Sequence, residues 1–271
     1  MGNRKLLLVI LLLALGLIFA RGDRNAYALP NGGYAHTGLL IQPEELKAYI
    51  DKKDPDIRVI DVREKPKYLD GHIPGALQVW RPDIVDNNHP LPGMMAPQNQ
   101  MEELMGRLGV SHKHRLIIYS DGPDNARLWW ILAYYGFSID QLKLLDGGID
   151  GWKTKGFPTE KGTPQVNQTP SKLPGKVKST EPLLCTLPEV KEALKNPKKV
   201  VLDVRSKKEY LGEETLSGAA KPGRIPGVAY TEWKEVLVKE GPYKGYWKSS
   251  DEIKKLFWDI GVTPDKDIYM Y

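Results

Sequence analysis

Residues 59–76 read VIDVREKPKYLDGHIPGA, and this stretch decides the fold class of the chain. It opens with apolar residues that stop at Asp61, and residues 77–80 resume an apolar run after a Pro-Gly turn. Short apolar runs bounded by charged and turn residues are typical of strands in a parallel sheet. We therefore predict strands over residues 57–61 and 77–80.

Helical patterns alternate with these strands. Met101, Leu104, Met105 and Leu108 recur at the spacing of one helix face, and residues 116–119 form the next apolar strand. The other elements expected in this half are a helix from Pro43, a helix from about Asn125 that ends at Gly136, a strand over residues 142–145 and a short helix after it. This alternation predicts an α/β fold with a parallel sheet.

The same pattern occurs twice in the chain. Residues 201–214 read VLDVRSKKEYLGEE and residues 223–230 read GRIPGVAY, which repeat the opening stretch with about ten additional residues between the two blocks. Residues 108–119, LGVSHKHRLIIY, likewise match residues 260–271, IGVTPDKDIYMY. An internal repeat of this kind indicates two copies of one structural unit.

The second copy lacks a counterpart for the last part of the first. Tyr271 corresponds to Tyr119, whereas the first copy continues for about 40 residues from Ser120 to Pro158. We therefore expect the second domain to be incomplete. The expected divisions are residues 1–28 as signal or anchor, 36–160 as the first domain, 161–182 as a linker rich in Pro, Thr and Lys, and 183–271 as the second domain.

The N-terminus predicts export. A basic start precedes an uncharged apolar run over residues 6–20, which at about 22 Å of helix is short for a bilayer span and fits a secretory signal. A small-x-small pattern ends at Ala28, so we expect residues 1–28 to be either removed or retained as an anchor. In both cases we expect a periplasmic or extracellular location, with membrane association through residues 6–20 in the anchored form.

Composition narrows the classes of function. The formal net charge of +5 comes mostly from scattered lysines, and no nucleic-acid motif is present, so we expect no nucleic-acid partner. The single cysteine, Cys185, excludes an intramolecular disulfide and a cysteine-based zinc site, and the five histidines lack metal-ligand spacing. We expect neither metal nor cofactor. Cys185 aligns with the apolar Ile41, which predicts a packed thiol with a raised pKa.

The repeated blocks resemble the rhodanese family of sulfurtransferases. The residues that carry the resemblance are Asp61-Val62-Arg63, Tyr68, Gly71-His72-Ile73-Pro74-Gly75-Ala76, Leu145-Asp146-Gly147-Gly148, Trp152, Asp203-Val204-Arg205, Glu209-Tyr210-Leu211-Gly212 and Arg224-Ile225-Pro226-Gly227. The resemblance covers residues 40–271 and is closest to the two-domain type. It implies two tandem rhodanese-like α/β domains, each a parallel β-sheet flanked by helices, of which the first is inactive.

The resemblance also implies a reaction and its partners. The family moves sulfane sulfur from a small anionic donor such as thiosulfate to a thiol or cyanide acceptor, through a cysteine persulfide. Its catalytic cysteine directly follows a strand and opens a loop, Cys-x-x-Gly-x-Arg, ahead of a helix. Backbone N–H groups and the helix N-terminus lower the pKa of that thiol.

The chain departs from this pattern at both loops. In the first copy the cysteine position is Ser120, which cannot form a persulfide, and Asp121 and Asp124 add negative charge where an anion would bind. In the second copy the position would follow Tyr271. We therefore expect no catalytic residue within these 271 residues, and we expect them to form an inactive fragment.

Three residues of the second copy are candidates for substrate binding. Asp203 and Arg205 could position the active loop, but an internal ion pair is the interpretation we favour, because Asp61 and Arg63 occur in the copy that lacks a nucleophile. Glu209 could orient a substrate or be an exposed acidic residue on a helix. Two other functions stay open, a non-catalytic rhodanese-like binding module and a phosphatase-like relative with a longer cysteine loop.

Overall fold

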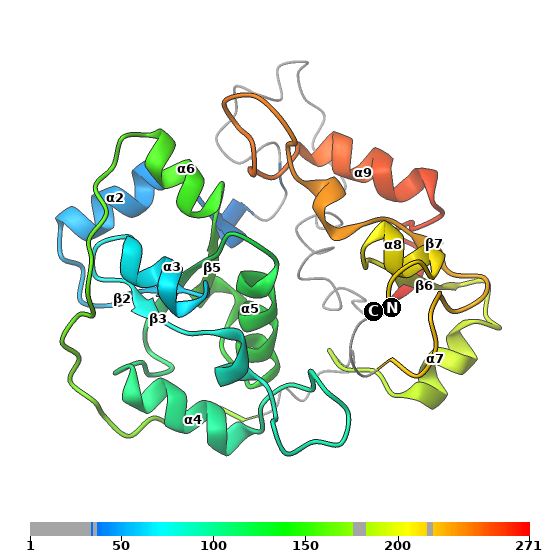
Figure 1. The fold of residues 1–271 in the computed structure, drawn as a ribbon, viewed down its shortest axis with the longest axis horizontal. Coiled ribbons are helices and arrows are strands. Elements are labelled where there is room, and N and C mark those ends of the chain that lie inside the picture. Colours follow the sequence, from blue (N-terminus) through cyan, green and yellow to red (C-terminus); the bar gives the residue numbers. More distant parts are fainter. Residues whose placement is uncertain (1–33, 35–36, 176–182, 216–218) are drawn as a thin grey trace. The chain divides into compact units, whose positions relative to one another are not determined.

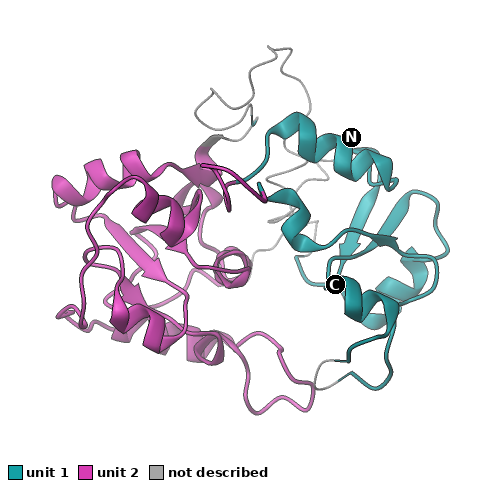
Figure 2. Cartoon of the chain, turned by 45° about the horizontal axis from the view of Figure 1, so that its top comes forward, with its two compact units in different colours: residues 1–36, 178–238, 247–271 teal, residues 37–177, 239–246 magenta. Residues whose placement is uncertain are grey.

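The computed structural model describes residues 34, 37–175, 183–215 and 219–271 (Figure 1). The export signal expected over residues 1–28 lies outside this part of the chain. Within the described residues, no helix has the length and apolar character needed to cross a bilayer. The chain divides into two compact units, which Figure 2 colours separately. Of the described residues, the first-copy unit comprises 37–175 and 239–246; the second-copy unit comprises 34, 183–215, 219–238 and 247–271.

A five-stranded parallel sheet forms the centre of the first-copy unit. Its strands lie in the order β1-β5-β4-β2-β3. The strands are β1 (Leu40–Ile41), β2 (Ile57–Asp61), β3 (Leu77–Gln78), β4 (Arg115–Tyr119) and β5 (Leu142–Leu145). The predicted parallel sheet is confirmed. The strand predicted over residues 77–80 is shorter than expected, because the chain turns into the 3₁₀ helix η3 (Arg81–Ile84), where Pro82 cannot continue a ladder.

Helices connect these strands, as the sequence predicts. They are α2 (Pro43–Asp51), α3 (Lys65–Asp70), α4 (Gln98–Arg107), α5 (Asp124–Tyr134) and α6 (Gly148–Thr154), with the 3₁₀ helices η2 (Thr37–Leu39) and η4 (Ile139–Gln141). Pro43 occupies the first turn of α2, where its missing N–H costs nothing. Helix α5 begins one residue earlier than predicted. Gly136 follows it with a φ of 94°, which only glycine adopts readily after a helix end.

Both faces of the sheet are covered. On one face, strand residues such as Val59 and Ile117 form a buried cluster with Leu46 of α2, Tyr68 of α3 and Trp152 of α6. Alternate strand residues point to the opposite face, where α5 packs against β4 and β5. Covering both faces explains why β4 reads as a continuous apolar run.

The second-copy unit repeats part of this arrangement. Its elements are α7 (Leu187–Ala193), β6 (Lys199–Asp203), α8 (Lys207–Leu211), β7 (Ala229–Tyr230), η5 (Trp233–Val236), α9 (Ser250–Asp259) and β8 (Asp267–Met270). The three strands are parallel in the order β7-β6-β8, which matches β3-β2-β4 of the first copy. Lys199 pairs with Asp267 as Ile57 pairs with Arg115. The shared register confirms the alignment of Tyr271 with Tyr119.

A segment of the second copy belongs to the first-copy unit. Residues 239–246 follow η5 in sequence, yet they are part of the unit built from residues 37–177 (Figure 2). The Tyr246 side chain packs against Gly147 and Gly151 at the start of α6. A methyl group at Gly147 would overlap the Tyr246 ring, and one at Gly151 would lie 2.9 Å from the Tyr246 hydroxyl oxygen. Both glycines are therefore required for this contact.

The segment after α6 runs along the first-copy unit. We expected residues 161–182 to be a linker, and the structure describes them as far as residue 175. Glu160 forms an antiparallel bridge with His72, and the Thr169 amide donates to the Gly106 carbonyl oxygen at 3.1 Å. We call residues 160–169 the strap. Its two ends are thus bonded to different parts of the same unit.

Candidate functional site

Polar side chains gather at the carboxyl edge of the sheet in each unit. In the first copy β2 ends at Asp61 and β4 ends at Tyr119, which are paired in register. In the second copy β6 ends at Asp203, and Tyr271 directly follows β8. Because parallel strands end at the same edge of a sheet, these side chains meet there, where α/β proteins place their binding sites.

In the first copy an aspartate, an arginine and a tyrosine form a closed cluster. The Arg63 Nε donates to Asp61 Oδ1 at 3.0 Å and Nη2 donates to Asp61 Oδ2 at 2.6 Å. The Tyr119 hydroxyl also donates to Asp61 Oδ2, at 2.7 Å. The Arg63 Nη2 and the Tyr119 hydroxyl reach the following turn, at the Gly71 carbonyl oxygen and the Ile73 amide. The cluster thus joins two strand ends to the turn between α3 and β3.

The second copy builds the same cluster from Asp203, Arg205 and Tyr271. The Arg205 Nε donates to Asp203 Oδ1 at 3.0 Å, and Nη2 donates to Asp203 Oδ2 at 2.7 Å and to the Gly223 carbonyl oxygen at 2.8 Å. The Ile225 amide donates to the Tyr271 hydroxyl at 3.2 Å. The Asp203–Arg205 pair therefore ties the turn down as an internal ion pair, which is the interpretation favoured from the sequence.

The two clusters differ in how deeply their arginines are buried. Both aspartates are fully buried, but the Arg63 side chain is 5% exposed and the Arg205 side chain is 28% exposed. Burial lowers the pKa of the Arg63 guanidinium, but the hydrogen bonds and charge of Asp61 raise it by more, so the net effect is a raised pKa. For Arg205 the hydrogen bonds to Asp203 are the largest cause of its raised pKa. Burial, followed by the Asp61 charge, raises the pKa of Tyr119 far above its ordinary value.

Ser120 opens the loop that follows β4, the position at which the sequence comparison of the two copies placed the expected cysteine. The Ser120 carbonyl oxygen lies against Gly148 of α6, where a methyl group would approach it to 2.5 Å. The Asp121 carboxylate pairs with the Lys67 ammonium at 2.6 Å, and the Asp124 carboxylate pairs with Arg81. The loop contains two ion-paired carboxylates and no thiol. It therefore offers no nucleophile for persulfide formation, and the cations Lys67 and Arg81 are not free to bind an anion.

Glu209 serves the helix in which it lies. Its Oε2 accepts from the Ser206 amide at 3.2 Å and from the Ser206 hydroxyl at 2.8 Å, and the Glu209 amide donates to the Ser206 hydroxyl. These bonds form a capping box at the start of α8. The side chain is buried rather than exposed, and its second oxygen lies 4.0 Å from Arg205. Glu209 therefore lies beside the cluster, but its carboxylate is hydrogen-bonded to Ser206 of its own helix start.

Cys185 lies ahead of α7, away from any strand end. The thiol is half-buried, and burial together with the nearby Glu189 carboxylate raises its pKa. The raised pKa predicted for this thiol is confirmed. A thiol with a raised pKa is a weak nucleophile at neutral pH, because little thiolate is present.

The turn of each copy stacks a basic side chain on a tyrosine. The buried His72 ring stacks on Tyr68 at 3.9 Å between ring centroids, and its Nδ1 lies 2.9 Å from the Tyr68 carbonyl oxygen. In the second copy the Arg224 guanidinium lies 4.4 Å above the Tyr210 ring and donates to the Tyr210 carbonyl oxygen. The basic residue of each turn therefore holds the turn against the preceding helix.

The chain is similar to rhodanese-like domains and to several sulfurtransferases. The sequence model of the rhodanese-like domain matches residues 42–155. The chain is 31% identical to the sulfur carrier protein TtuD of Thermus thermophilus over 255 residues, which cover 88% of this chain and 84% of that protein. It is 30% identical to a thiosulfate sulfurtransferase of Azotobacter vinelandii, over 87% of this chain and 82% of the relative.

The chain is also similar to a third relative and to a solved structure. The chain is 30% identical to the 3-mercaptopyruvate sulfurtransferase of Escherichia coli K12, over 86% of this chain and 83% of the relative. The crystal structure of SseA from Escherichia coli, a 3-mercaptopyruvate sulfotransferase with the rhodanese fold, superposes with a TM-score of 0.72 at 26% identity, over 85% of this chain and 87% of that one.

Proposed function

The chain belongs to the rhodanese family of sulfurtransferases, and from this premise we propose that it serves the transfer of sulfane sulfur from thiosulfate to a thiol or cyanide acceptor. In this proposal a cysteine thiolate attacks the outer sulfur of thiosulfate, a sulfur–sulfur bond forms on the enzyme, and sulfite leaves with the electron pair of the broken bond. Cyanide or a thiolate then takes the outer sulfur from the persulfide and regenerates the thiolate.

The first copy has a supporting role in this proposal. Ser120 stands at the nucleophile position, and Lys67 and Arg81 are paired with Asp121 and Asp124, so these two cations are already engaged by carboxylates of the chain. The Asp61–Arg63–Tyr119 cluster holds the strand ends around a loop that lacks a thiol. We therefore assign the first copy a structural function.

The second copy supplies the framework of the reactive loop. The observation that carries this assignment is the cluster of Asp203, Arg205 and Tyr271, in which Arg205 bonds both oxygens of its aspartate and the carbonyl of the following turn as Arg63 does, and which ends at the position after which the family places its cysteine. Asp203 and Arg205 act here as positioning residues. The persulfide thiol in this proposal lies outside the 271 residues, since Cys185 has a raised pKa and no strand-end position.

A sulfur-transfer assay tests this assignment. The 271-residue chain and a version extended by the downstream codons should be compared for thiocyanate formation from thiosulfate and cyanide. We expect background rates from the 271-residue chain and turnover from the extended chain. Turnover by the 271-residue chain that disappears in Cys185→Ser would contradict the proposal and would make Cys185 the sulfur carrier.

A second candidate is a non-catalytic rhodanese-like binding module. The observation that favours it is the first-copy loop, where ion-paired carboxylates replace the thiol and the anion cradle. An extended chain without a cysteine after Tyr271, or one that binds thiosulfate without turnover, would support the module over the enzyme.

We also propose export, with processing near Ala28. The apolar run over residues 6–20 and the small-x-small pattern support it. N-terminal sequencing of the membrane and soluble fractions tests it, and recovery of the unprocessed chain from the cytoplasm would contradict it.

A further inference from the structure

The first-copy unit contains a pocket far from the loop after β4. The pocket has a volume of about 450 Å³, within the range of small-molecule sites. Its sheet residues are Ile57, Arg58 and Val59, at the beginning of β2, and Leu77 of the edge strand β3. Ser120 follows the opposite, carboxyl end of the sheet, so the pocket is a separate site.

The strap forms the outer wall of this pocket and is fixed at both ends. At one end the Gly75 amide donates to the Glu160 carboxylate at 2.6 Å, beside the backbone bridge between Glu160 and His72. At the other end the strap runs so close to α4 that a methyl group at Gly109 would lie 2.7 Å from the Asn167 carbonyl oxygen. A wall held at two ends keeps the cavity open without a ligand.

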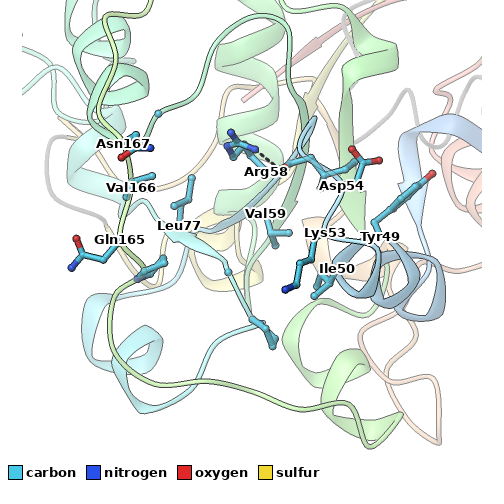
Figure 3. A pocket seen from close by; sticks show the side chains of 15 residues that line it. Tyr49, Ile50, Lys53, Asp54, Arg58, Val59, Leu77, Gln165, Val166 and Asn167 are labelled. Carbon is cyan, nitrogen blue, oxygen red and sulfur yellow. Dashed lines mark hydrogen bonds between the residues drawn. The ribbon is translucent and has the colours of Figure 1, made fainter.

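The floor of the pocket is apolar. Val59 and Leu77 are buried strand residues whose side chains form the base, and Ile50, Ile57 and Val166 add to the sides. Figure 3 shows Val59 and Leu77 between the end of α2 and the strap. A ligand that enters this space removes apolar surface from water, which favours an apolar body.

Two cationic side chains reach the same space. In Figure 3 the ends of Lys53 and Arg58 point toward the strap side, whereas the Asp54 carboxylate points the opposite way. The Arg58 Nη1 is fixed by the Pro55 and Ile57 carbonyl oxygens at 2.7 and 2.9 Å, which leaves its other donors available. The Asp54 carboxylate is neutralised by Arg115 at 2.8 Å. The charge presented to the pocket is therefore positive.

Lys53 lies directly after α2, in the left-handed conformation that ends the helix, where its amide donates to the Ile50 carbonyl oxygen and the Asp54 amide donates to the Tyr49 carbonyl oxygen. Its φ of 52° is the only positive value at a non-glycine position among the described residues. Lysine rarely adopts this conformation, which asparagine and glycine accept more easily. The lysine ammonium has no hydrogen-bond acceptor or acidic partner within the described residues. The helix end accounts for this conformation, and what bears on binding is that the unpaired Lys53 cation lies at the pocket.

We propose that this pocket binds a small amphiphilic carboxylate. The carboxylate head lies between the Lys53 ammonium and the Arg58 guanidinium, and the apolar body lies on Val59 and Leu77 behind the strap. The two cations favour a negatively charged head group, and the apolar floor favours an apolar body. No chemical step takes place at this site, so the ligand binds without depending on sulfur transfer.

Octanoate binding to the full chain tests the proposal. Methyl NMR of Val59, Leu77 and Val166 should show saturable shifts with sodium octanoate and weaker shifts with 1-octanol, which keeps the tail and lacks the charge. Lys53→Asn should raise the half-saturation concentration about fivefold, as expected for loss of a solvent-accessible ion pair. This variant suits the positive φ, so it should fold normally.

Two further variants complete the test. Lys52→Asn removes the neighbouring lysine, which does not line the pocket, and should leave octanoate binding unchanged. Val166→Trp should fill the cavity from the strap and abolish the Val59 and Leu77 shifts without altering the core. The proposal is overturned if octanoate shifts only methyl groups of residues 6–20, if 1-octanol binds as tightly as octanoate, or if Lys52→Asn and Lys53→Asn weaken binding equally.

Discussion

The two copies place the same three side chains at the same sheet edge, but they differ in how completely they bury them. Asp61 and Asp203 are equally buried, whereas Arg63 is almost enclosed and Arg205 is partly open to solvent. The bonds from each arginine to its aspartate and to the following turn are alike. The cluster is therefore part of the fold in both copies, and burial, rather than bonding, determines how strongly each copy depends on it.

The largest difference is expected when the aspartate loses its charge. Asp61→Asn leaves the Arg63 guanidinium buried without a counter-ion and should destabilise the first-copy unit by about 3–5 kcal/mol. Asp203→Asn should cost the second-copy unit about 2 kcal/mol, because Arg205 can be hydrated in its place. Hydrogen exchange read on peptides from β2 and β6 measures each unit separately. Equal losses of stability in both units would contradict the prediction that burial of the arginine sets the cost.

Removal of the tyrosine hydroxyl should have a smaller effect. Tyr119→Phe deletes a donor to Asp61 and the acceptor for the buried Ile73 amide, and should cost about 1–3 kcal/mol. Tyr271→Phe should cost about 1 kcal/mol, since Tyr271 is half-buried and the Ile225 amide can bond water. Urea unfolding of each variant beside the parent chain provides the measurement. A greater loss in Tyr271→Phe would reverse the order that burial predicts.

Alkaline pH should destabilise the first copy through Tyr119. The pKa of Tyr119 is raised in the fold, so its contribution to stability is complete below the ordinary tyrosine pKa and is lost as the pH rises above about 10. The loss should approach 1.4 kcal/mol per pH unit for this one group. Tyr119→Phe should reduce the pH dependence of the β2 peptide between about pH 10 and 11, and Tyr68 and Tyr135, whose pKa values burial raises to about 12, should account for the slope that remains. An unchanged slope in this variant would exclude Tyr119 as its source.

The smallest effect is expected at the exposed turn. Arg224→Ala removes a guanidinium stacked on Tyr210 and should cost the second-copy unit about 0.5 kcal/mol. The matched change His72→Ala opens a cavity between Tyr68 and the strap and should cost more, because His72 is fully buried. Thermal unfolding of the two variants ranks them. A larger shift in Arg224→Ala would show that the exposed turn carries more of the stability than its burial indicates.

Much of this framework was readable from the amino acids. Asp61 with Asp203, and Tyr119 with Tyr271, stand at matching places in repeats whose surroundings differ, so a shared structural role could be predicted. The role of Glu209 was missed, although Ser206-x-x-Glu209 is a helix-start signature, and the same signature precedes α9 at Ser249 and Glu252. Local patterns of this kind act over a few residues and can be predicted without the tertiary fold.

Long-range contacts could not be predicted in this way. The pocket beside Lys53 forms only because the strap returns from α6 to a place opposite Leu77 of β3, and nothing in the proline-rich linker sequence specifies that path. The bond from Gly75 to Glu160 joins residues far apart in sequence, and it forms only when the whole unit has assembled. Tertiary packing rather than local pattern determines such features.

The packing of Tyr246 on Gly147 and Gly151 has a consequence for the order of assembly during translation. Domains generally fold as units from the N-terminus as the chain is synthesised at about 5–20 residues per second. The first-copy unit has all of its strands once β5 has been made, but its glycine surface on α6 stays uncovered until η5 and the segment after it have been synthesised. The ribosome therefore delivers the last piece of the earlier unit in the middle of the later one, and neither unit can be finished before the other has begun.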